Sequence, residues 1–138
     1  MFILSLFLGM GISKADGVLP IQVVFMCRTE KGDKEIALFK QGDNFIYQYG
    51  SNMGAPELQL VRPSAKVIKE PWPGIGRNIW NNITLTNKEY SYTIRSSYDK
   101  MEDKSTSGVS ISKNDAHVAS VECSTAYSIV DNLSSFVE

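Results

Sequence analysis

The sequence predicts an all-β protein, an antiparallel meander of about eight short strands that forms a small barrel or sandwich. Runs rich in β-branched and aromatic residues alternate between apolar and polar positions, and turns rich in glycine, asparagine and aspartate separate them. Two cysteines near the two ends of the chain are placed to tie the first strand to the last. The 138 residues are enough for one domain.

The N-terminal segment has the pattern of a secretory signal peptide. Residues 2–12 form an apolar run, shorter than the roughly 20 residues that a membrane-spanning helix needs. Ser13 and Ala15 then place small residues at the −3 and −1 positions of a cleavage site. We therefore expect a signal peptide at 1–15 and a single β-barrel-like domain at 16–138. The alternative is that the apolar run is the first strand or helix of the fold.

Four strands are expected in the first half of the domain. Gly32 and Gly42 mark tight turns before and after the second of them. In the third strand Phe45, Tyr47 and Tyr49 share one face, as the two-residue period of a strand requires. The predicted ranges are 21–27, 34–40, 44–49 and 57–61.

The segment 63–78 is expected to be an irregular connection. Prolines at 63, 71 and 73 remove backbone donors and fix φ, so we expect the segment to lie outside any sheet. A long irregular connection in a small domain is often functional, although it can also simply bridge two halves of a sheet.

Four more strands follow, and the longest clean alternation places Tyr90, Tyr92 and Ile94 on one face. The predicted ranges are 79–86, 90–98, 108–113 and 116–123. The polar stretch 99–107 between two of them is expected to be an exposed loop. The tail 125–136 has apolar residues at helical spacing, so it is expected either as a short amphipathic C-terminal helix or as a loosely docked tail.

Cys27 and Cys123 are expected to form a disulfide, because an even number of cysteines in an exported protein usually pairs. Two buried thiols or a metal pair are the alternatives, but His117 is the single histidine and offers few further ligands. We expect no metal site and no cofactor. If the first and last strands are neighbours, the sheet has no free edge, which favours a monomer.

Composition and motifs argue against two classes of function. The formal net charge is −1, without a long run of one sign, so a nucleic-acid-binding face is not expected. A nucleophile–base–orienter set is missing, because His117 has no partners in a recognised motif. The carboxylate groups lie in polar turns where solvent leaves their pKa values untuned for catalysis. We therefore expect a protein that is not an enzyme.

The 63–80 segment is the best candidate for a binding surface. Tryptophan and arginine are the residue types that dominate interface hot spots, and a proline-stiffened loop loses little entropy on binding. Lysines at its start would add a basic rim able to meet carboxylates in a partner's cleft. The predicted partner-binding residues are Ser64, Lys66, Lys69, Trp72, Arg77 and Trp80.

The layout resembles the small periplasmic β-barrel proteins of Gram-negative bacteria, among them the C-type lysozyme inhibitors. The resemblance lies in the signal peptide, the first strand ending in Cys27, the aromatic strand 45–49 and the closing strand ending in Cys123. It implies a loop whose serine and nearby lysine engage the catalytic carboxylates of a lysozyme. The nearest match to that loop is Ser64-Ala65-Lys66, without the glycine and tyrosine of the family motif.

These observations lead to the hypothesis of an exported, periplasmic or secreted, non-enzymatic binding or inhibitor protein. Its partner would be a cell-wall hydrolase or a wall-degrading toxin, met through the 63–80 loop, and stable membrane insertion is not expected after signal cleavage. The alternatives are a periplasmic carrier of a small ligand and a purely structural β-domain. The bulky aromatic residues at inward positions argue against a carrier, because they would fill a small barrel.

Overall fold

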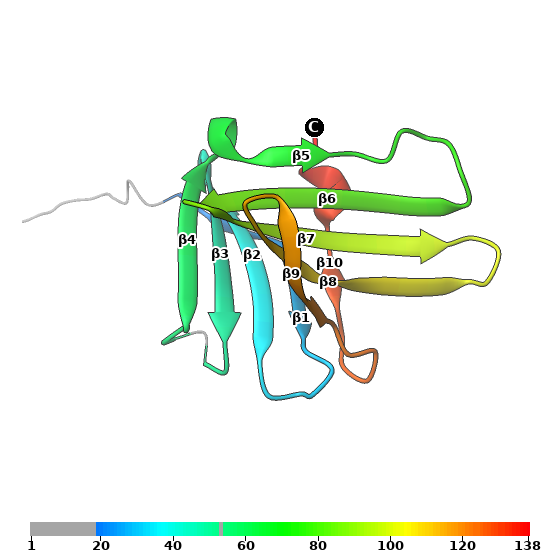
Figure 1. Cartoon of the computed structure of the whole chain (residues 1–138), viewed down its shortest axis with the longest axis horizontal. Coiled ribbons are helices and arrows are strands. Elements are labelled where there is room, and N and C mark those ends of the chain that lie inside the picture. The colour runs from blue at the N-terminus through cyan, green and yellow to red at the C-terminus, as the bar shows by residue number, and fades with distance from the viewer. Residues whose placement is uncertain (1–18, 53) are drawn as a thin grey trace, which may run out of the picture.

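The computed structural model describes residues 19–52 and 54–138, and the predicted signal peptide lies outside these residues. The fold is all-β, as predicted, and consists of two antiparallel five-stranded sheets (Figure 1). The strands are β1 (Ile21–Arg28), β2 (Glu35–Gln41), β3 (Asn44–Gly50), β4 (Leu58–Pro63), β5 (Ile68–Glu70), β6 (Asn78–Asn87), β7 (Tyr90–Asp99), β8 (Lys104–Lys113), β9 (Ala116–Glu122) and β10 (Val130–Asp131). Two short 3₁₀ helices, η1 (Ser64–Lys66) and η2 (Leu133–Ser135), complete the fold.

The first sheet has the strand order β10-β1-β2-β3-β4. The turn between β2 and β3 contains Gly42 at φ 57°, a conformation that glycine adopts without strain. In β3 the expected alternation is present, because Phe45 and Tyr47 are buried while Gln48 is half-buried. The sheet therefore presents one apolar face.

The second sheet has the order β5-β6-β7-β8-β9, and its three central strands are ten residues long. Their hairpin turns contain non-glycine residues with positive φ, namely Lys88, Asp103, Asn114 and Asp115. Asparagine and aspartate tolerate this conformation best among residues with a side chain. Ile83, Ile94 and Val109 are aligned across the three strands and are fully buried.

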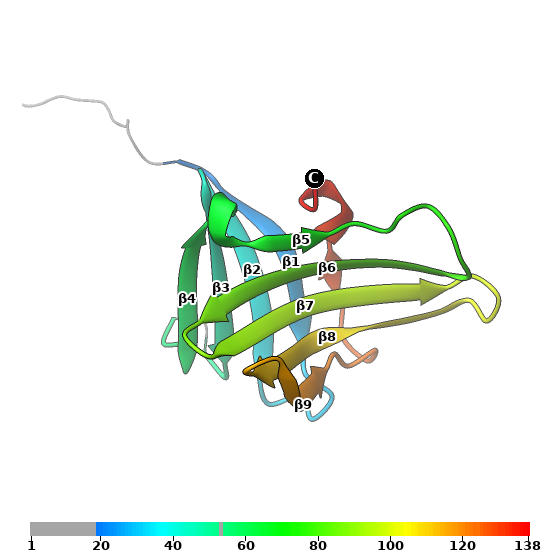
Figure 2. The ribbon, with the colours of Figure 1, turned by 45° about the horizontal axis from the view of Figure 1, so that its top comes forward.

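The strands of the two sheets cross, and the core lies between them (Figure 2). The first sheet covers only part of the second. Five strands about 4.8 Å apart span roughly 19 Å, whereas a ten-residue strand is about 33 Å long. As Figures 1 and 2 show, β6, β7 and β8 extend past β10, beyond the first sheet. We call this uncovered end of the second sheet the overhang: residues 78–82, 95–99 and 104–107, which lie beyond the buried residues Ile83, Ile94 and Gly108.

The predicted disulfide between Cys27 and Cys123 is present, with a Cα–Cα distance of 5.8 Å. Both cysteines are buried, and an antiparallel bridge between Thr29 and Cys123 lies beside them. The chain then continues into a tail whose Leu133 and Val137 pack into the core. The disulfide thus fixes the end of the last long strand, and the tail after it, to the first strand.

The prediction that 63–78 lies outside any sheet is wrong for part of the segment. Pro63 ends β4, and residues 68–70 form β5, which pairs with β6. Both strands lie at sheet edges, where a missing backbone donor is tolerated. The segment is irregular from Pro71 to Arg77.

Three other predictions need correction. The tail forms β10 and η2 instead of an amphipathic helix, because Asn132 bonds to the backbone of β1 through its amide side chain and its N–H. The expected loop 99–107 is mostly strand, since β8 begins at Lys104 and pairs with β7 along its whole length. Strand β1 pairs with β2 and β10, and it meets the end of β9 only at the bridge described above. Both sheets therefore keep edge strands, and the argument for a monomer from a closed sheet does not apply.

No helix within the described part of the chain is long and apolar enough to cross a membrane. The disulfide fits the expectation of export, because such bonds persist in oxidising compartments. Export itself, and whether it leads to the periplasm or out of the cell, stay predictions.

We predict that replacing both cysteines by serine destabilises the domain. The disulfide closes a loop with a sequence separation of 96 residues, and loss of such a cross-link is expected to lower the free energy of unfolding by about 3–5 kcal/mol. Denaturant unfolding, followed by tyrosine and tryptophan fluorescence, measures the difference. As a control, a reducing agent should shift the unfolding midpoint of the wild-type protein and leave that of the double variant unchanged. Equal midpoints for the oxidised wild type and the double variant would contradict a stabilising role for the disulfide.

Candidate functional site

The predicted binding residues fall into groups at different places in the fold. Ser64 and Lys69 belong to η1 and β5, next to the end of β4. Trp72 and Arg77 belong to the irregular loop between β5 and the start of β6, which Figure 1 shows at the opposite end of β6 from β4. Lys66 is exposed, and Trp80 is half-buried on β6, opposite Ser97. The six residues therefore do not form one continuous patch.

Ser64 and Lys69 are engaged with each other. The Lys69 ammonium donates to the Ser64 carbonyl at 3.0 Å and to the Ser64 hydroxyl at 2.7 Å. It also lies 5.7 Å from the centroid of the Phe45 ring, a favourable cation–π arrangement. These contacts hold η1 against the start of β5. In this conformation the serine and lysine stabilise the turn, and they would have to separate to reach into a partner's cleft.

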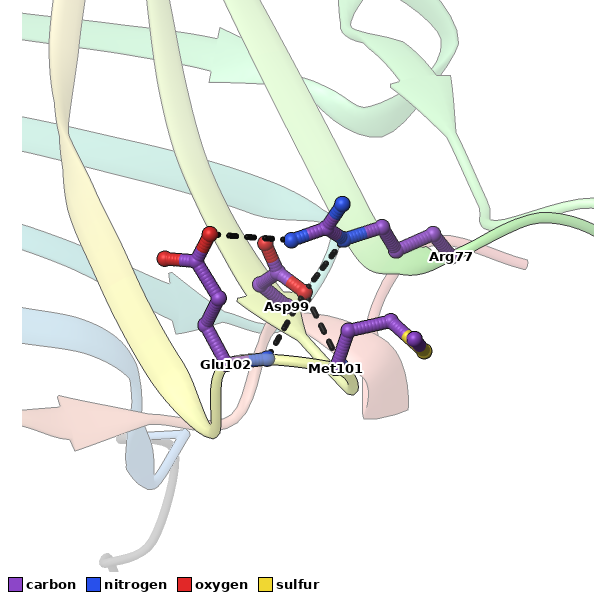
Figure 3. Close-up of polar contacts among 4 residues, drawn as sticks. All are labelled: Arg77, Asp99, Met101 and Glu102. Carbon is purple, nitrogen blue, oxygen red and sulfur yellow. Dashed lines mark hydrogen bonds and ion pairs between the residues drawn. The ribbon is translucent and has the colours of Figure 1, made fainter.

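Arg77 anchors the loop to the turn between β7 and β8 (Figure 3). Its Nε donates to Asp99 Oδ1 at 2.8 Å, and its Nη2 donates to Glu102 Oε2 at 3.0 Å. Asp99 Oδ1 also accepts the backbone N–H groups of Met101, at 2.9 Å, and of Glu102, at 3.2 Å. The hydrogen bond from the guanidinium lowers the pKa of Asp99, and the same bond raises the pKa of Arg77. One carboxylate thus orders two loops.

Trp72 adds a second connection between the same two loops. Its indole Nε1 donates to the Ile75 carbonyl at 3.0 Å, and its backbone N–H donates to Asn81 Oδ1 at 3.3 Å. The Lys100 ammonium lies 5.2 Å from the centroid of the Trp72 ring. The Lys100 backbone N–H donates to the Arg77 carbonyl at 3.2 Å. The conformation of this irregular loop is therefore fixed by several independent contacts.

The two loops present large apolar side chains to solvent. Ile75 is 77% exposed and Met101 is 78% exposed, the highest values among the exposed large hydrophobic residues of the described chain. We define the tip surface as Trp72, Ile75, Arg77, Lys100 and Met101. Trp72 and Arg77 were predicted from the sequence, whereas Ile75, Lys100 and Met101 were not. An apolar Ile75 between two glycines was a usable signal, whereas Met101 was hidden in a charged run.

The described residues offer little that points to catalysis. His117 lies on the exposed strand β9, where its Nε2 is 2.8 Å from the Ser120 hydroxyl. Between residues 19 and 138, Met53 aside, no cluster of three or more histidine, cysteine, aspartate or glutamate side chains is arranged to hold a metal ion. The expectation of a non-enzymatic protein stays a prediction.

The interior between the sheets is largely filled. Phe25, Phe45 and Tyr47 are at most 1% exposed. An apolar opening lined by Tyr47, Tyr49, Tyr92 and neighbouring aliphatic residues has a volume of about 100 Å³, which is small beside the ~300–1,000 Å³ of typical small-molecule sites. Burial raises the pKa of the Tyr47 hydroxyl above its ordinary value.

The chain matches no protein-family model, and no curated protein or solved structure matches it either. The likeness to lysozyme inhibitors therefore stays a hypothesis.

We predict that Tyr47 makes the protein sensitive to alkaline pH. An unfolded tyrosine ionises at about pH 10, whereas burial keeps Tyr47 neutral in the folded state, so stability is lost as the pH rises above 10. For this one group the free energy of unfolding should fall by about 1.4 kcal/mol per pH unit. Urea unfolding at several pH values from about 8 to about 11.5 gives the free energy of unfolding, and thus this slope, for the wild type and for Tyr47→Phe.

The matched control for this experiment is Tyr127→Phe, which makes the same chemical change at a side chain that is 52% exposed. Tyr47→Phe should flatten the alkaline slope, and Tyr127→Phe should leave it nearly as in the wild type. Equal slopes in all three proteins would rule out Tyr47 as the responsible group.

We also predict that Asp99→Ala loosens the tip surface without unfolding the domain. The change removes the acceptor for Arg77 and for the amides of Met101 and Glu102. Amide hydrogen exchange at these two residues should become much faster, while the core strands stay protected. Glu89→Ala, at a turn carboxylate 3.9 Å from Lys113, is the control and should leave exchange at Met101 unchanged. Unchanged exchange in Asp99→Ala would show that the carboxylate does not order the loop.

Proposed function

We propose that this is an exported, non-enzymatic protein that binds a protein partner through the tip surface. The supporting observation is that Ile75 and Met101 are held in solvent on loops that Arg77 and Asp99 connect. Exposed apolar side chains of this size are individually common on protein surfaces. Two of them on one ordered projection, beside a tryptophan and an arginine, have the composition of an interface hot spot.

The contacts that order the two loops favour tight binding. A loop that is already fixed loses little conformational entropy when a partner covers it. Burying Ile75 and Met101 would contribute roughly 1.5–3 kcal/mol each from the apolar area removed from water. Trp72 and Lys100 would add a face with both apolar and cationic character.

The partner class that we propose is a cell-wall hydrolase, either a muramidase or amidase of the wall or a wall-degrading toxin. This choice follows the layout resemblance described above and the expectation of export to the periplasm or beyond. The Cys27–Cys123 disulfide supports export. Contact through the tip surface would place the apolar pair at the partner, with Lys100 and Arg77 at its side.

A carrier of a small apolar ligand inside the domain is less well supported. Its interior would have to open, because Tyr47 and its neighbours fill the space between the sheets. A binding role for the surface requires no such change.

The proposal is tested by binding the purified domain to muramidases and amidases, with biolayer interferometry and inhibition of wall hydrolysis as the measurements. Ile75→Asp combined with Met101→Asp should weaken binding at least about a hundredfold, since two apolar contacts worth roughly 3–6 kcal/mol in total are lost. The matched control is Val118→Asp, which places the same charge at a 53% exposed apolar residue on β9.

If the wild-type protein neither binds nor slows any enzyme of these classes, the hydrolase assignment fails. If it binds one of them and the tip variant binds equally well, the tip surface is not the interface. Loss of binding in Val118→Asp but not in the tip variant would place the interface on β9.

A further inference from the structure

We infer that the inner face of the overhang is a second binding site, for a neutral saccharide. A groove of about 290 Å³ lies between the overhang and the segment around β10. Its lining includes Ile79, Asn81, Ser96, Tyr98 and Ser107 of the overhang and Asp131 of β10. The groove is distinct from the tip surface, with which it shares no residue, and from the apolar opening between the sheets.

The inner face of the second sheet changes character where the first sheet stops covering it. One cross-strand row consists of Ile83, Ile94 and Val109, all fully buried. Two residues along each strand toward the overhang, the aligned row is Asn81, Ser96 and Ser107. A row on the same face that turns from aliphatic to polar indicates that the face meets water or a polar ligand there.

Three polar side chains of the groove are held in place by hydrogen bonds to other parts of the domain. Tyr98 donates its hydroxyl to Asp103 at 2.7 Å, which holds the phenol in place beside the floor of the groove. Asn81 accepts the Trp72 backbone N–H through Oδ1, so its amide group is oriented. Across from them, Asp131 accepts the Leu133 backbone N–H at 3.2 Å through Oδ1.

The chemistry of the lining selects the class of ligand. The serine hydroxyls of the inner face and the Asn81 amide both donate and accept, as the hydroxyls of a sugar do. Asp131 is the one ionisable carboxylate among the lining residues, and no cationic side chain lines the groove with it, so an anionic ligand is disfavoured. Tyr98 and Ile79 pair opposite each other and supply the apolar patch on which a sugar ring can rest.

The size and position of the groove also fit a short saccharide better than a peptide. Its volume is near the lower end of the range for small-molecule sites, about 300–1,000 Å³. Its floor is the face of a sheet whose strands are already paired, so it offers no free backbone ladder to an extended peptide. We therefore assign one or two neutral sugar rings as the ligand.

The test is a titration of the ¹⁵N-labelled domain with N,N′-diacetylchitobiose and with cellobiose, monitored by amide chemical shifts. We expect saturable shifts with a dissociation constant in the millimolar range for at least one of the two, centred on the amides of 79–81, 96–98 and 105–107. The variant Ser96→Leu fills the groove and should abolish the shifts. The matched control is Ser91→Leu, the same change on the outer face of the same strand, which should preserve them.

Thermal unfolding and the spectrum of each variant establish that both are folded before they are titrated. Absence of saturable shifts with both saccharides overturns the inference. Shifts centred elsewhere, or equal binding by the two variants, overturn it as well. The outcome is independent of partner binding by the tip surface, because Ile75→Asp with Met101→Asp leaves the groove residues unchanged.

Discussion

The structure depends on a mismatch of dimensions between two crossing sheets. The first sheet is as wide as its five strands, whereas the second is as long as its ten-residue strands. Where they overlap, Ile83, Ile94 and Val109 meet Phe25, Tyr47 and their neighbours and exclude water. Where they do not overlap, the inner face of β6–β8 lies outside the closely packed core. The overhang, its largely polar inner face and the loops at its end all follow from this difference.

The two ends of the long strands are held in different ways. At the covered end Arg62, on β4, donates to the Thr86 carbonyl at 2.8 Å and so ties the β6–β7 turn to the first sheet. At the free end no such sheet is available, and the order of the loops comes from Arg77, Asp99 and the Trp72–Lys100 contact. Exposed charge pairs contribute little to global stability, but they can select one loop conformation among many. That selection is what a binding surface requires.

The sequence was informative about the covered part of the fold and about the disulfide, because burial imposes a two-residue alternation and export favours paired cysteines. The sequence was misleading where the pairing of a segment depends on a neighbouring strand and not on the segment's own residue pattern. The polar run Lys104–Ser107 has no apolar alternation, yet it forms strand because β7 provides a complete ladder of partners. The tail has apolar residues at helical spacing, but the Asn132 side chain hydrogen-bonds to the backbone of β1 and Leu133 packs into the core. Of the tip surface, only Trp72 and Arg77 were visible, since the contact between two loops distant in sequence leaves no local pattern.

The polar residues of the overhang contribute little apolar burial to the stability of the domain. Ordering each of its residues costs roughly 1–2 kcal/mol of backbone entropy, and each ladder hydrogen bond returns only about 0.5–1.5 kcal/mol. In the core the burial of aliphatic side chains offsets this entropy cost. Asn81, Ser96 and Ser107 have no aliphatic side chain to bury. Strands shortened to the width of the first sheet would keep the same core. The physical consequence of the additional length is therefore presentation: it carries one ordered apolar projection away from the body of the domain, and it forms one wall of a groove whose other wall is the segment with Ile129 and Asp131.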